Sequence, residues 1–315
     1  MRILITGATG FVGRHLVRHL TLAAPDSELH GTSLRMQEDI YGVTLHEVDL
    51  RAPAAVHELI AKLKPDQIYH LAAQADVRAS FDIPWETFES NVRGQLNIFE
   101  ACVKLNIAPR MVIASTGELY ANATLPDRPT DETVLPQPTS PYAVSKLTQE
   151  MLCIQYHFSR ELPAIIVRLF NQIGPGQREG FVAPDFAIQI ARIEAGLQSP
   201  IMKVGNLEAR RDFTDVRDVS RAMRLLMASG QPGEIYNVSS GTTHAIRDIL
   251  TILCQESKVQ ITIEADPTRM RPARVPLLWG DNTKLHNMTS WRPLISLQSS
   301  LRDVLNDCRQ RVLMN

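Results

Sequence analysis

The sequence lacks the features that define several large protein classes. Its four cysteines, Cys102, Cys153, Cys254 and Cys308, stand far apart and form neither a zinc motif nor a disulfide framework. No apolar run is long enough to span a bilayer, and Met1 leads directly into RILITG without a secretory signal. We therefore expect a soluble, cytoplasmic protein with reduced cysteines and no metal site.

An excess of charge of either sign is also missing. The 315 residues include 33 basic and 34 acidic ones, which gives a formal net charge of -1, and neither sign is clustered. Nucleic acids and anionic membranes are bound by concentrated positive charge, so neither is an expected partner. Apolar residues make up 44% of the chain, an ordinary value for a globular core. The expected partner is a small soluble ligand.

Short apolar runs alternate with helix-length segments over the first part of the chain. The runs that we expect to be strands are residues 2–6, the run ending at Thr32, and residues 44–50, 66–73, 110–115 and 164–170. Helical patterns such as residues 12–24 and 91–105 separate them. Near-continuous apolar strands separated by helices predict an α/β fold, a doubly wound parallel Rossmann sheet covered on both faces.

The alternation loosens after about Gly174, where proline and glycine punctuate the sequence. Later helical patterns cover residues 186–196, 245–257 and 300–313, residues 261–265 and 234–238 read as strands, and the run up to residue 215 has no clear period. We assign residues 234–238 to the main sheet. The expected nucleotide-binding domain is therefore residues 1–170 plus about 212–242, and the smaller substrate lobe is about 171–211 and 243–315.

A glycine motif, GATGFVG, follows the first strand and precedes the first helix. Gly7, Gly10 and Gly13 stand three residues apart in it. Glycines allow backbone N–H groups to approach a pyrophosphate, and the positive end of the following helix attracts the same anion. A glycine turn with a purely structural role is the alternative, but the order of strand, glycines and helix predicts a dinucleotide site.

The end of the second strand indicates which dinucleotide is bound. An acidic residue about 20 positions after the glycines usually binds the adenosine ribose of NAD, whereas HGTSLR offers Thr32, Ser33 and Arg35. Small hydroxyls and an arginine suit a 2′-phosphate, so NADP or NADPH is predicted over NAD, although Arg35 could also be an exposed loop residue. Asp49 could contact the adenine or could only stabilise a turn.

The segment SPYAVSK carries a candidate catalytic pair. Tyr142 and Lys146 are four residues apart, which places them one turn apart on the same face of a helix. Because a neighbouring ammonium favours a phenolate, we expect Lys146 to lower the pKa of Tyr142 enough for proton exchange near neutrality. Lys146 could also bind the nicotinamide ribose. The spacing is common by chance, but its position after a phosphate cradle makes the pair significant.

Together these motifs resemble a known family. GATGFVG, HLAAQ, NVRG with Asn91, STGELY, YAVSK, RDFTDVRD and YNVSSG stand in the order seen in extended short-chain dehydrogenases/reductases, the NAD-dependent epimerase/dehydratase family, from residue 3 to about 241. LFNQIGPGQREGFVAPDFA, KVGNLEARRDFTDVRD and RMRPARVP resemble the branch of GDP-mannose 4,6-dehydratases and GDP-4-keto-6-deoxy-D-mannose reductases. The substrate implied by this branch is a GDP-linked deoxyhexose.

The resemblance implies roles for individual residues. Thr116 and Tyr142 would hold the sugar 4-oxygen, with Tyr142 as proton donor or acceptor and Lys146 as the residue that positions the cofactor. The residues expected at the cofactor are Gly7, Gly10, Phe11, Val12, Gly13, Thr32, Ser33, Arg35, Asp49, Leu50, Leu71, Ala72, Ala73, Tyr142 and Lys146. Those expected at the sugar nucleotide are Asn171, Val182, Lys203, Arg211 and Arg271. Asn91 is expected to be structural.

Several of these residues have simpler alternative roles. Asn171 could only cap a turn, and Lys203 or Arg211 could pair with Glu208 or Asp212. In addition, Arg274 stands where the branch places a glutamate that would accept hydrogen bonds from the ribose hydroxyls, and arginine cannot accept them. The identity of the nucleotide base is therefore left open at this point.

Position 117 separates two reactions of this branch. The dehydratases place a hydroxyl residue, an acidic or hydroxyl residue and a glutamate at this strand end, whereas this chain has Thr116, Gly117 and Glu118. A 4-ketoreductase needs only a hydride from NADPH and a proton from Tyr142. We therefore expect reduction, for example of GDP-4-keto-6-deoxy-D-mannose to GDP-D-rhamnose. The alternatives are a 4,6-dehydratase or epimerase that uses Glu118 as base, and a non-catalytic dinucleotide sensor.

The resemblance also implies a homodimer that pairs two helices, at residues 91–104 and 142–157. The stretches 96–103 and 147–158 are apolar on more than one face, as helices buried against both a sheet and a partner would be. Ordinary core packing would explain the same pattern.

Overall fold

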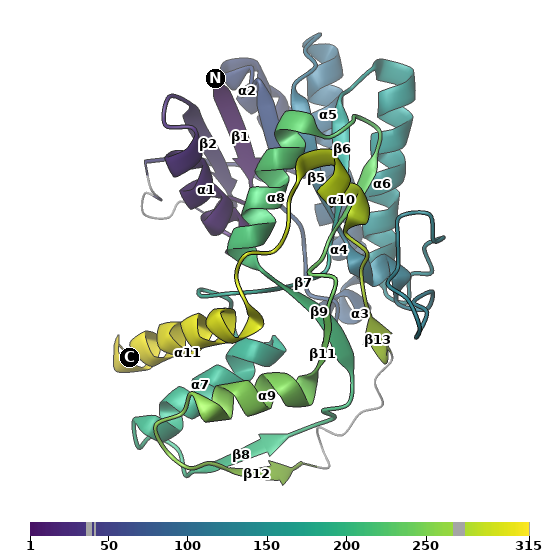
Figure 1. The fold of residues 1–315 in the computed structure, drawn as a ribbon. Coiled ribbons are helices and arrows are strands. Elements are labelled where there is room, and N and C mark those ends of the chain that lie inside the picture. The colour runs from purple at the N-terminus through teal and green to yellow at the C-terminus, as the bar shows by residue number, and fades with distance from the viewer. Residues whose placement is uncertain (36–39, 41, 267–274, 315) are drawn as a thin grey trace.

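The large parallel sheet determines the architecture of the upper part of the molecule (Figure 1). The computed structural model describes residues 1–35, 40, 42–266 and 275–314. The strands of the large sheet are β1 (Arg2–Thr6), β2 (Glu28–Ser33), β3 (Thr44–Glu47), β4 (Gln67–His70), β5 (Arg110–Thr116), β6 (Ala164–Leu169) and β10 (Ile235–Val238). Their order is β10-β6-β5-β4-β1-β2-β3, and neighbouring strands run parallel. The predicted doubly wound Rossmann sheet is confirmed.

Helices cover both faces of this sheet (Figure 1). They are α1 (Phe11–Ala23), α2 (Pro53–Leu63), α5 (Gly94–Lys104), α6 (Pro141–Arg160), α8 (Val216–Ser229) and α10 (Thr283–Thr289). The short helices α3 (Ala79–Asp82) and α4 (Pro84–Phe88) and the π-helical turn at Glu89–Arg93 pack on α6, and a 3₁₀ turn at Gly117–Tyr120 follows β5. Proline begins α2, α4 and α6, where its fixed φ suits the first turn and its missing N–H costs nothing.

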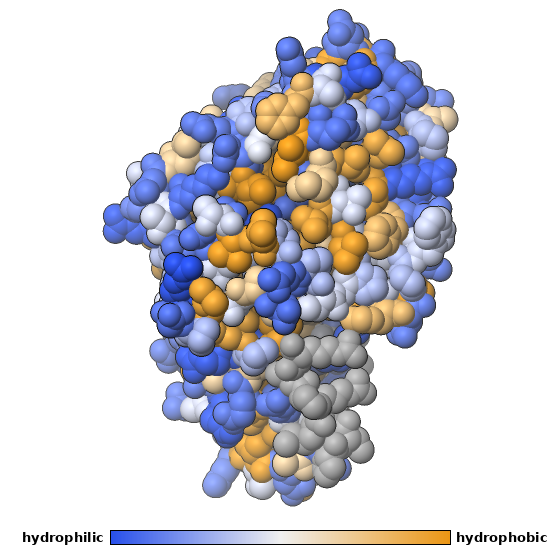
Figure 2. All heavy atoms as spheres, turned by 90° about the vertical axis from the view of Figure 1, so that its right-hand side faces the viewer, coloured by the Kyte–Doolittle hydropathy of each residue, from blue (hydrophilic) through white to orange (hydrophobic). Residues whose placement is uncertain are grey.

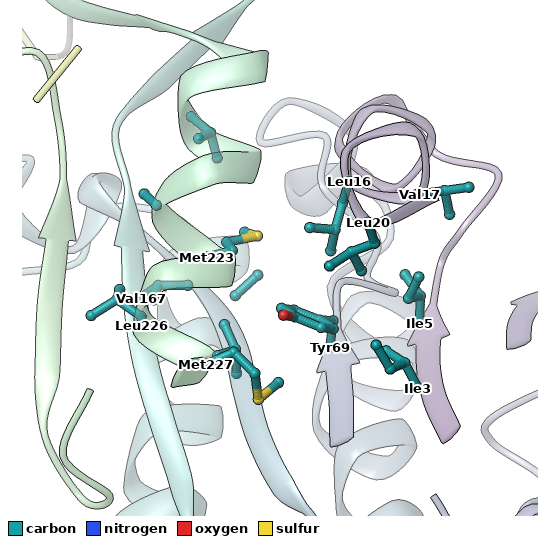
Figure 3. Packing of buried hydrophobic residues seen from close by; sticks show 14 of the residues in the cluster. Ile3, Ile5, Leu16, Val17, Leu20, Tyr69, Val167, Met223, Leu226 and Met227 are labelled. Carbon is teal, nitrogen blue, oxygen red and sulfur yellow. The ribbon is translucent and has the colours of Figure 1, made fainter. Parts of the chain in front are cut away.

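One core cluster fills the space between the sheet and helices α1 and α8 (Figure 3). Leu16 and Leu20 of α1 and Met223 of α8 converge on Tyr69 of β4. Full burial of each such side chain contributes about 1.5–3 kcal/mol. A second cluster lies on the opposite face, where α2, α5 and α6 pack. The carboxyl ends of the strands are thereby held rigidly at one edge.

The described residues of the lower lobe form three helices and two small sheets, which lie below the large sheet in Figure 1. The helices are α7 (Val182–Glu194), α9 (Ile246–Gln255) and α11 (Leu297–Met314), and the strands are β7 (Asn171–Ile173), β8 (Ile201–Val204), β9 (Arg210–Asp215), β11 (Thr243–Ala245), β12 (Thr262–Ala265) and β13 (Leu277–Leu278). β9 pairs with β7, β11 and β13, while β8 pairs with β12. The three helices enclose a third core cluster.

One segment departs from the expected division of the chain. Residues 243–315 were assigned to the smaller lobe, but α10 packs against α8 and β10. Leu285 and Trp291 belong to the core cluster of α1 and α8, and the Trp291 side chain is only 1% exposed. Its indole N–H donates a hydrogen bond of 3.0 Å to the carbonyl oxygen of Asp218. Residues 283–291 therefore lie with the large sheet.

The cysteines and the helix lengths complete the description of the fold. Cys102, Cys153 and Cys308 are buried, Cys254 is half-buried, and all four are free thiols. Within the described residues, no helix combines the length and the apolar character that a membrane span requires.

Candidate active site

A large cavity opens at the carboxyl edge of the sheet, where β1 and β4 are neighbours. The chain leaves these two strands toward opposite faces, which is the point where open α/β sheets bind ligands. The cavity has a volume of about 580 Å³ and is lined by Gly7, Thr9, Gly10, Thr32, Ser33, Leu34, Arg35, Val48, Asp49, Leu50, Arg51, Leu71, Ala72, Ala73, Gln74 and Ser90. Most residues expected at the cofactor thus lie together, and we call this the dinucleotide cavity.

The glycine loop can pack closely and leave room for a bound pyrophosphate, because its glycines stand where a Cβ atom would collide with neighbouring backbone. Gly7 has φ +68°, and a Cβ atom there would lie 2.9 Å from the backbone nitrogen of Ala72. A Cβ atom at Gly13 would lie 2.1 Å from the carbonyl oxygen of Gly7. Gly10 precedes α1 without a capping side chain, so the first N–H groups of the helix remain available to an anion. Gly13 therefore packs the helix under the loop, while Gly7 and Gly10 line the cavity.

Hydroxyls and arginines surround the far end of the dinucleotide cavity. The buried Thr32 hydroxyl accepts a hydrogen bond of 3.4 Å from the N–H of Gly7, so it supports the glycine loop. The hydroxyls of Ser33 and Thr9 lie 3.2 Å apart, and exposed Arg35 lines the cavity beside them. Thr9 was not predicted from the sequence. These groups can bind a phosphate on the adenosine ribose.

Asp49 stabilises a turn, which was one of its two possible roles, and it also lines the dinucleotide cavity. Its Oδ1 accepts hydrogen bonds from the backbone N–H of Arg51 at 2.9 Å and from Nε of Arg51 at 3.0 Å. The second oxygen pairs with Nη2 of Arg51 at 2.7 Å. These bonds hold the pKa of Asp49 below its ordinary value. Arg51, which sequence reasoning missed, brings a second guanidinium to the cavity.

A smaller cavity adjoins the first at the end of β4, because Leu71 and Ala73 line both. Its volume is about 190 Å³, and it is lined by Val12, Leu71, Ala73, Ala75, Val77, Ala114, Ser115, Thr116, Glu118, Tyr142, Lys146, Leu169, Phe170, Asn171, Gln172, Gln177, Phe181 and Leu278. The predicted catalytic side chains Thr116, Tyr142 and Lys146 meet here, so we call it the reaction cavity.

Tyr142 stands in the first turn of α6 and keeps its proton. The Ser140 hydroxyl caps this helix by accepting a hydrogen bond of 3.1 Å from the N–H of Ala143. Burial raises the pKa of Tyr142 to about 12, while a hydrogen bond with the Thr116 hydroxyl opposes this shift and the charge of Glu118 adds to it. The expectation that Tyr142 exchanges its proton near neutrality is therefore wrong for this structure.

Lys146 lies one turn further along α6 and is directed to the backbone. Its Nζ donates a hydrogen bond of 2.8 Å to the carbonyl oxygen of Ala114. Burial lowers the pKa of Lys146 to about 8, and the nearby Cys153 and Glu150 oppose this shift. The ammonium is thus charged at neutral pH but close to its titration. Lys146 lines the reaction cavity, which adjoins the dinucleotide cavity, and this position suits contact with a bound cofactor.

Lys146 predicts a pH dependence. We expect kcat/KM for NADPH to fall as pH rises through about 8, because the ammonium of the free enzyme then loses its charge. The Lys146→Arg variant, whatever its rate, should show no such fall, since a guanidinium stays charged. The measurement is a pH profile of initial rates for both proteins. A wild-type profile that stays flat to about pH 10, where free lysine titrates, would contradict this assignment.

Gly117 and Glu118 occupy the strand end between the catalytic residues. A Cβ atom at Gly117 would lie 3.0 Å from the ring of buried Phe170, so the glycine allows the turn to pack closely on that ring. The N–H of Glu118 donates to the Thr116 hydroxyl at 3.2 Å. Burial raises the pKa of Glu118, and the positive charge of Arg211 opposes this shift.

Arg211 reaches the site from β9 of the lower lobe. The acidic residues that could have paired with it have other partners: Glu208 forms an ion pair with Arg247, and Asp212 accepts hydrogen bonds from Ser240 and Gly241. Burial lowers the pKa of Arg211, and Glu118 raises it. Arg211 therefore supplies positive charge near the reaction cavity, from the opposite lobe.

The remaining residues expected at the sugar nucleotide fall into three groups. Asn171 lines the reaction cavity, and its Oδ1 is buried without a hydrogen-bond partner in the described part of the chain. Val182 packs against the core of the lower lobe and Lys203 is exposed on β8, and the walls of the reaction cavity among the described residues include neither. Arg271 lies outside the described residues, as does Arg274.

Among the lining residues that were missed from the sequence are Gln172, Gln177 and Phe181, which lie before α7. The glycines and proline around them predicted a loop but gave no sign of where it would lie. Phe11 was expected at the cofactor, but its half-buried ring packs edge-on against His15, with 5.6 Å between the ring centroids. Among the described residues, the walls of the two cavities do not include it.

A buried polar network supports the catalytic helix from below. Arg168 of β6 and Glu150 of α6 form an ion pair of 2.7 Å, with side chains 3% and 0% exposed. The Ser115 hydroxyl also donates to Glu150. Asn91 is structural as expected: its Oδ1 accepts from the N–H of Gln74 at 2.7 Å and its Nδ2 donates to the Ser145 hydroxyl at 2.9 Å. It thereby ties the end of β4 to α6.

Comparison with known proteins identifies the family. A family model described as GDP-mannose 4,6 dehydratase matches residues 4–304. The chain belongs to this family. A family member from Pseudomonas aeruginosa named GDP-6-deoxy-D-mannose reductase is 36% identical over 99% of this chain and 98% of its own. GDP-mannose 4,6-dehydratase from Vibrio cholerae is 28% identical over 96% of this chain and 92% of its own. The predicted branch is confirmed.

Solved structures resemble this chain along its whole length. The structure of RMD from Pseudomonas aeruginosa complexed with NADPH is 35% identical, with a TM-score of 0.87 and coverage of 98% of this chain and 99% of that chain. The UDP-glucose 4-epimerase from Thermus thermophilus, in complex with NAD, is 30% identical, with a TM-score of 0.86 and the same coverage. Reductases, dehydratases and epimerases share this fold, so the choice of reaction depends on the site itself.

Proposed function

We propose that the protein reduces GDP-4-keto-6-deoxy-D-mannose to GDP-D-rhamnose with NADPH. The observation that carries this proposal is the strand end at Thr116, Gly117 and Glu118, where Gly117 brings neither an acid nor a hydroxyl to the reaction cavity. A 4,6-dehydratase has to expel the C6 hydroxyl as water and needs a second group to protonate it, whereas a ketone reduction consumes one proton, which Tyr142 can supply. A relative that is 36% identical over 99% of this chain is named GDP-6-deoxy-D-mannose reductase. Both observations support reduction over elimination.

The residues of the reaction cavity divide the work of that step. NADPH, when bound in the dinucleotide cavity, supplies the hydride. Tyr142 donates its phenolic proton to the oxygen at C4, while the Thr116 hydroxyl, which hydrogen-bonds with Tyr142, shares the developing negative charge. Lys146 orients the cofactor and keeps positive charge beside the site. Water then restores the proton of Tyr142.

A GDP-linked sugar as the substrate is proposed from two kinds of support, of which only the first concerns the base. The family model and the relatives described above carry GDP-sugar names. In the structure, Asn171 offers an unpartnered acceptor to a sugar hydroxyl, and Arg211 offers positive charge on the side of the lower lobe. A sugar nucleotide that spans the two lobes would meet both groups.

The proposal is tested by following NADPH absorbance with purified protein and GDP-4-keto-6-deoxy-D-mannose, with GDP-mannose alone in a parallel cell. We expect one NADPH to be oxidised for each keto sugar consumed and no reaction with GDP-mannose. Formation of a keto sugar from GDP-mannose without net cofactor consumption would instead identify a dehydratase, with Glu118 as the base.

Arg35 predicts the preference for the phosphorylated cofactor. In Arg35→Ala we expect KM for NADPH to rise about tenfold to hundredfold, because a charge-assisted hydrogen bond to phosphate contributes about 1.5–3 kcal/mol. KM for NADH, which lacks the 2′-phosphate, should stay within about twofold and serves as the control in the same assay. An equal rise in KM for both cofactors would show that Arg35 contributes to the shape of the cavity but does not bind the 2′-phosphate.

We also propose that the protein forms a homodimer through the face that carries α6. Figure 2 shows apolar side chains gathered on this side of the molecule. Val144, Met151 and Phe158 of α6 are exposed, as are Phe81 of α3 and Trp85 of α4, and both short helices pack on α6. Such a patch is typical of an interface between protomers. The particle mass in solution, from sedimentation or light scattering, tests this proposal.

A further inference from the structure

The turn at residues 175–177 is held by three side chains from two distant helices. It connects β7 with α7, and it ends at Gln177, which lines the reaction cavity. The carbonyl oxygen of Pro175 accepts a hydrogen bond of 2.8 Å from Nε2 of His15. The N–H of Gly176 donates to Oδ2 of Asp307 at 3.0 Å. The carbonyl oxygen of Gln177 accepts from Nη2 of Arg311 at 3.3 Å.

The helices that supply these side chains belong to different lobes. Asp307 and Arg311 stand one turn apart on α11 and form an ion pair of 2.8 Å. His15 stands on α1, whose first turn follows the glycine loop of the dinucleotide cavity. Figure 1 shows α1 in the upper part of the molecule and α11 below it. The turn at 175–177 is therefore fixed between the two lobes.

The chemistry of His15 suits this role. A carbonyl oxygen only accepts hydrogen bonds, so Nε2 must carry the proton. Burial lowers the pKa of His15 and favours the neutral ring, whose single N–H the Pro175 carbonyl oxygen places on Nε2. The ring of Phe11 packs edge-on against the imidazole and also approaches Gly174, where a Cβ atom would lie 3.7 Å from its Cζ. Two residues of α1 thus contact the start of the turn.

We propose that His15 is a positioning residue for the sugar nucleotide: through Pro175 it places Gln177 and Phe181 on the wall of the reaction cavity. Gln177 is buried, and its Nε2 donates to the carbonyl oxygen of Gln172 at 3.1 Å. Both residues line the reaction cavity, so a displacement of the turn would affect Gln177 and Gln172 together. The helix that begins at the phosphate cradle therefore also sets the shape of the sugar site. This inference rests on the proposed function for the identity of the substrate.

The kinetic test compares variants of two histidines on α1. In His15→Ala we expect KM for the keto sugar nucleotide to rise about three- to tenfold, the effect of one lost hydrogen bond. The rate constant kcat and the Kd of NADPH should stay within about twofold, because the glycine loop is untouched. His15→Gln places an N–H donor at a similar reach and should restore most of the affinity.

His19→Ala is the matched control. His19 lies one turn further along α1, is half-buried, and its Nε2 has no hydrogen-bond partner within the described residues. Its variant should keep the wild-type KM. The proposal is overturned if His15→Ala keeps the wild-type KM, if His15→Gln is as impaired as His15→Ala, or if the Kd of NADPH rises in parallel with KM.

A second test needs no substrate, so it separates this inference from the proposed function. Hydrogen exchange of the peptide that covers residues 176–181 should be faster in His15→Ala and in Asp307→Ala than in the wild type and in His19→Ala. Unchanged exchange in His15→Ala would overturn the proposal, whatever the result for Asp307→Ala. If the wild type fails to reduce the keto sugar, the proposed function is wrong, and the exchange comparison still decides whether His15 holds the turn.

Discussion

A Tyr142→Phe variant is expected to lose about 10²- to 10⁴-fold in kcat, the usual contribution of a positioned proton donor. The phenol of Tyr142, which hydrogen-bonds with the Thr116 hydroxyl, is the group that donates a proton to the oxygen at C4. Phenylalanine keeps the ring but has no proton to donate. Binding of NADPH should be nearly unchanged, because the glycine loop and the hydroxyls of the dinucleotide cavity stay in place. Steady-state rates with the keto sugar and a fluorescence titration with NADPH measure the two effects.

Tyr156→Phe provides the control for this substitution. Tyr156 lies on the same helix, but its hydroxyl bonds to Glu100 of α5 and takes no part in the reaction cavity. Its variant should turn over at the wild-type rate. Retained activity in Tyr142→Phe would remove that residue from its assigned role, and a parallel loss of NADPH affinity would point to a displaced helix.

The largest effect on stability is expected at the buried ion pair. Removing the carboxylate in Glu150→Ala should lower the free energy of unfolding by about 3–5 kcal/mol, because the charge of Arg168 is then buried without compensation. The Ser115 hydroxyl loses its acceptor in the same change. Chemical denaturation monitored by circular dichroism measures the difference.

Two further variants show whether burial causes this loss. Arg247→Ala breaks an exposed ion pair with Glu208 and should cost at most about 1 kcal/mol. The double variant Glu150→Met/Arg168→Met removes both buried charges and should recover much of the stability lost in Glu150→Ala. If Glu150→Ala and Arg247→Ala were equally stable, the buried pair would contribute no more than a surface contact.

The sequence allowed the main sheet to be predicted because its strands depend on local patterns. RMVIAS and AIIVRL are apolar on both faces, as strands covered by helices must be, and they became β5 and β6. β9 is different: RRDFTD is rich in charge and becomes a strand only through pairing with β7, β11 and β13. Such pairings join residues far apart in the chain, so no local window contains the signal.

The candidate site shows the same division. The glycines and the pair Tyr142 and Lys146 could be found because each motif lies within one short segment. The depth at which a side chain is buried cannot be read from a segment, and this depth raises the pKa of Tyr142 where the charge of Lys146 alone predicts a decrease. Gln177 was missed for a related reason: its position in the cavity depends on His15, 160 residues away from Pro175 in the sequence.

The return of the chain to the large sheet has a consequence during synthesis on the ribosome. β6 pairs with β10 on its outer side, and all six of its residues are buried in the finished protein. Until Ile235–Val238 has emerged, β6 is an apolar edge strand open to other chains. The core on the same side then still lacks Trp291. The dinucleotide-binding half is therefore made first but completed late, and its apolar edge is exposed to aggregation in the interval.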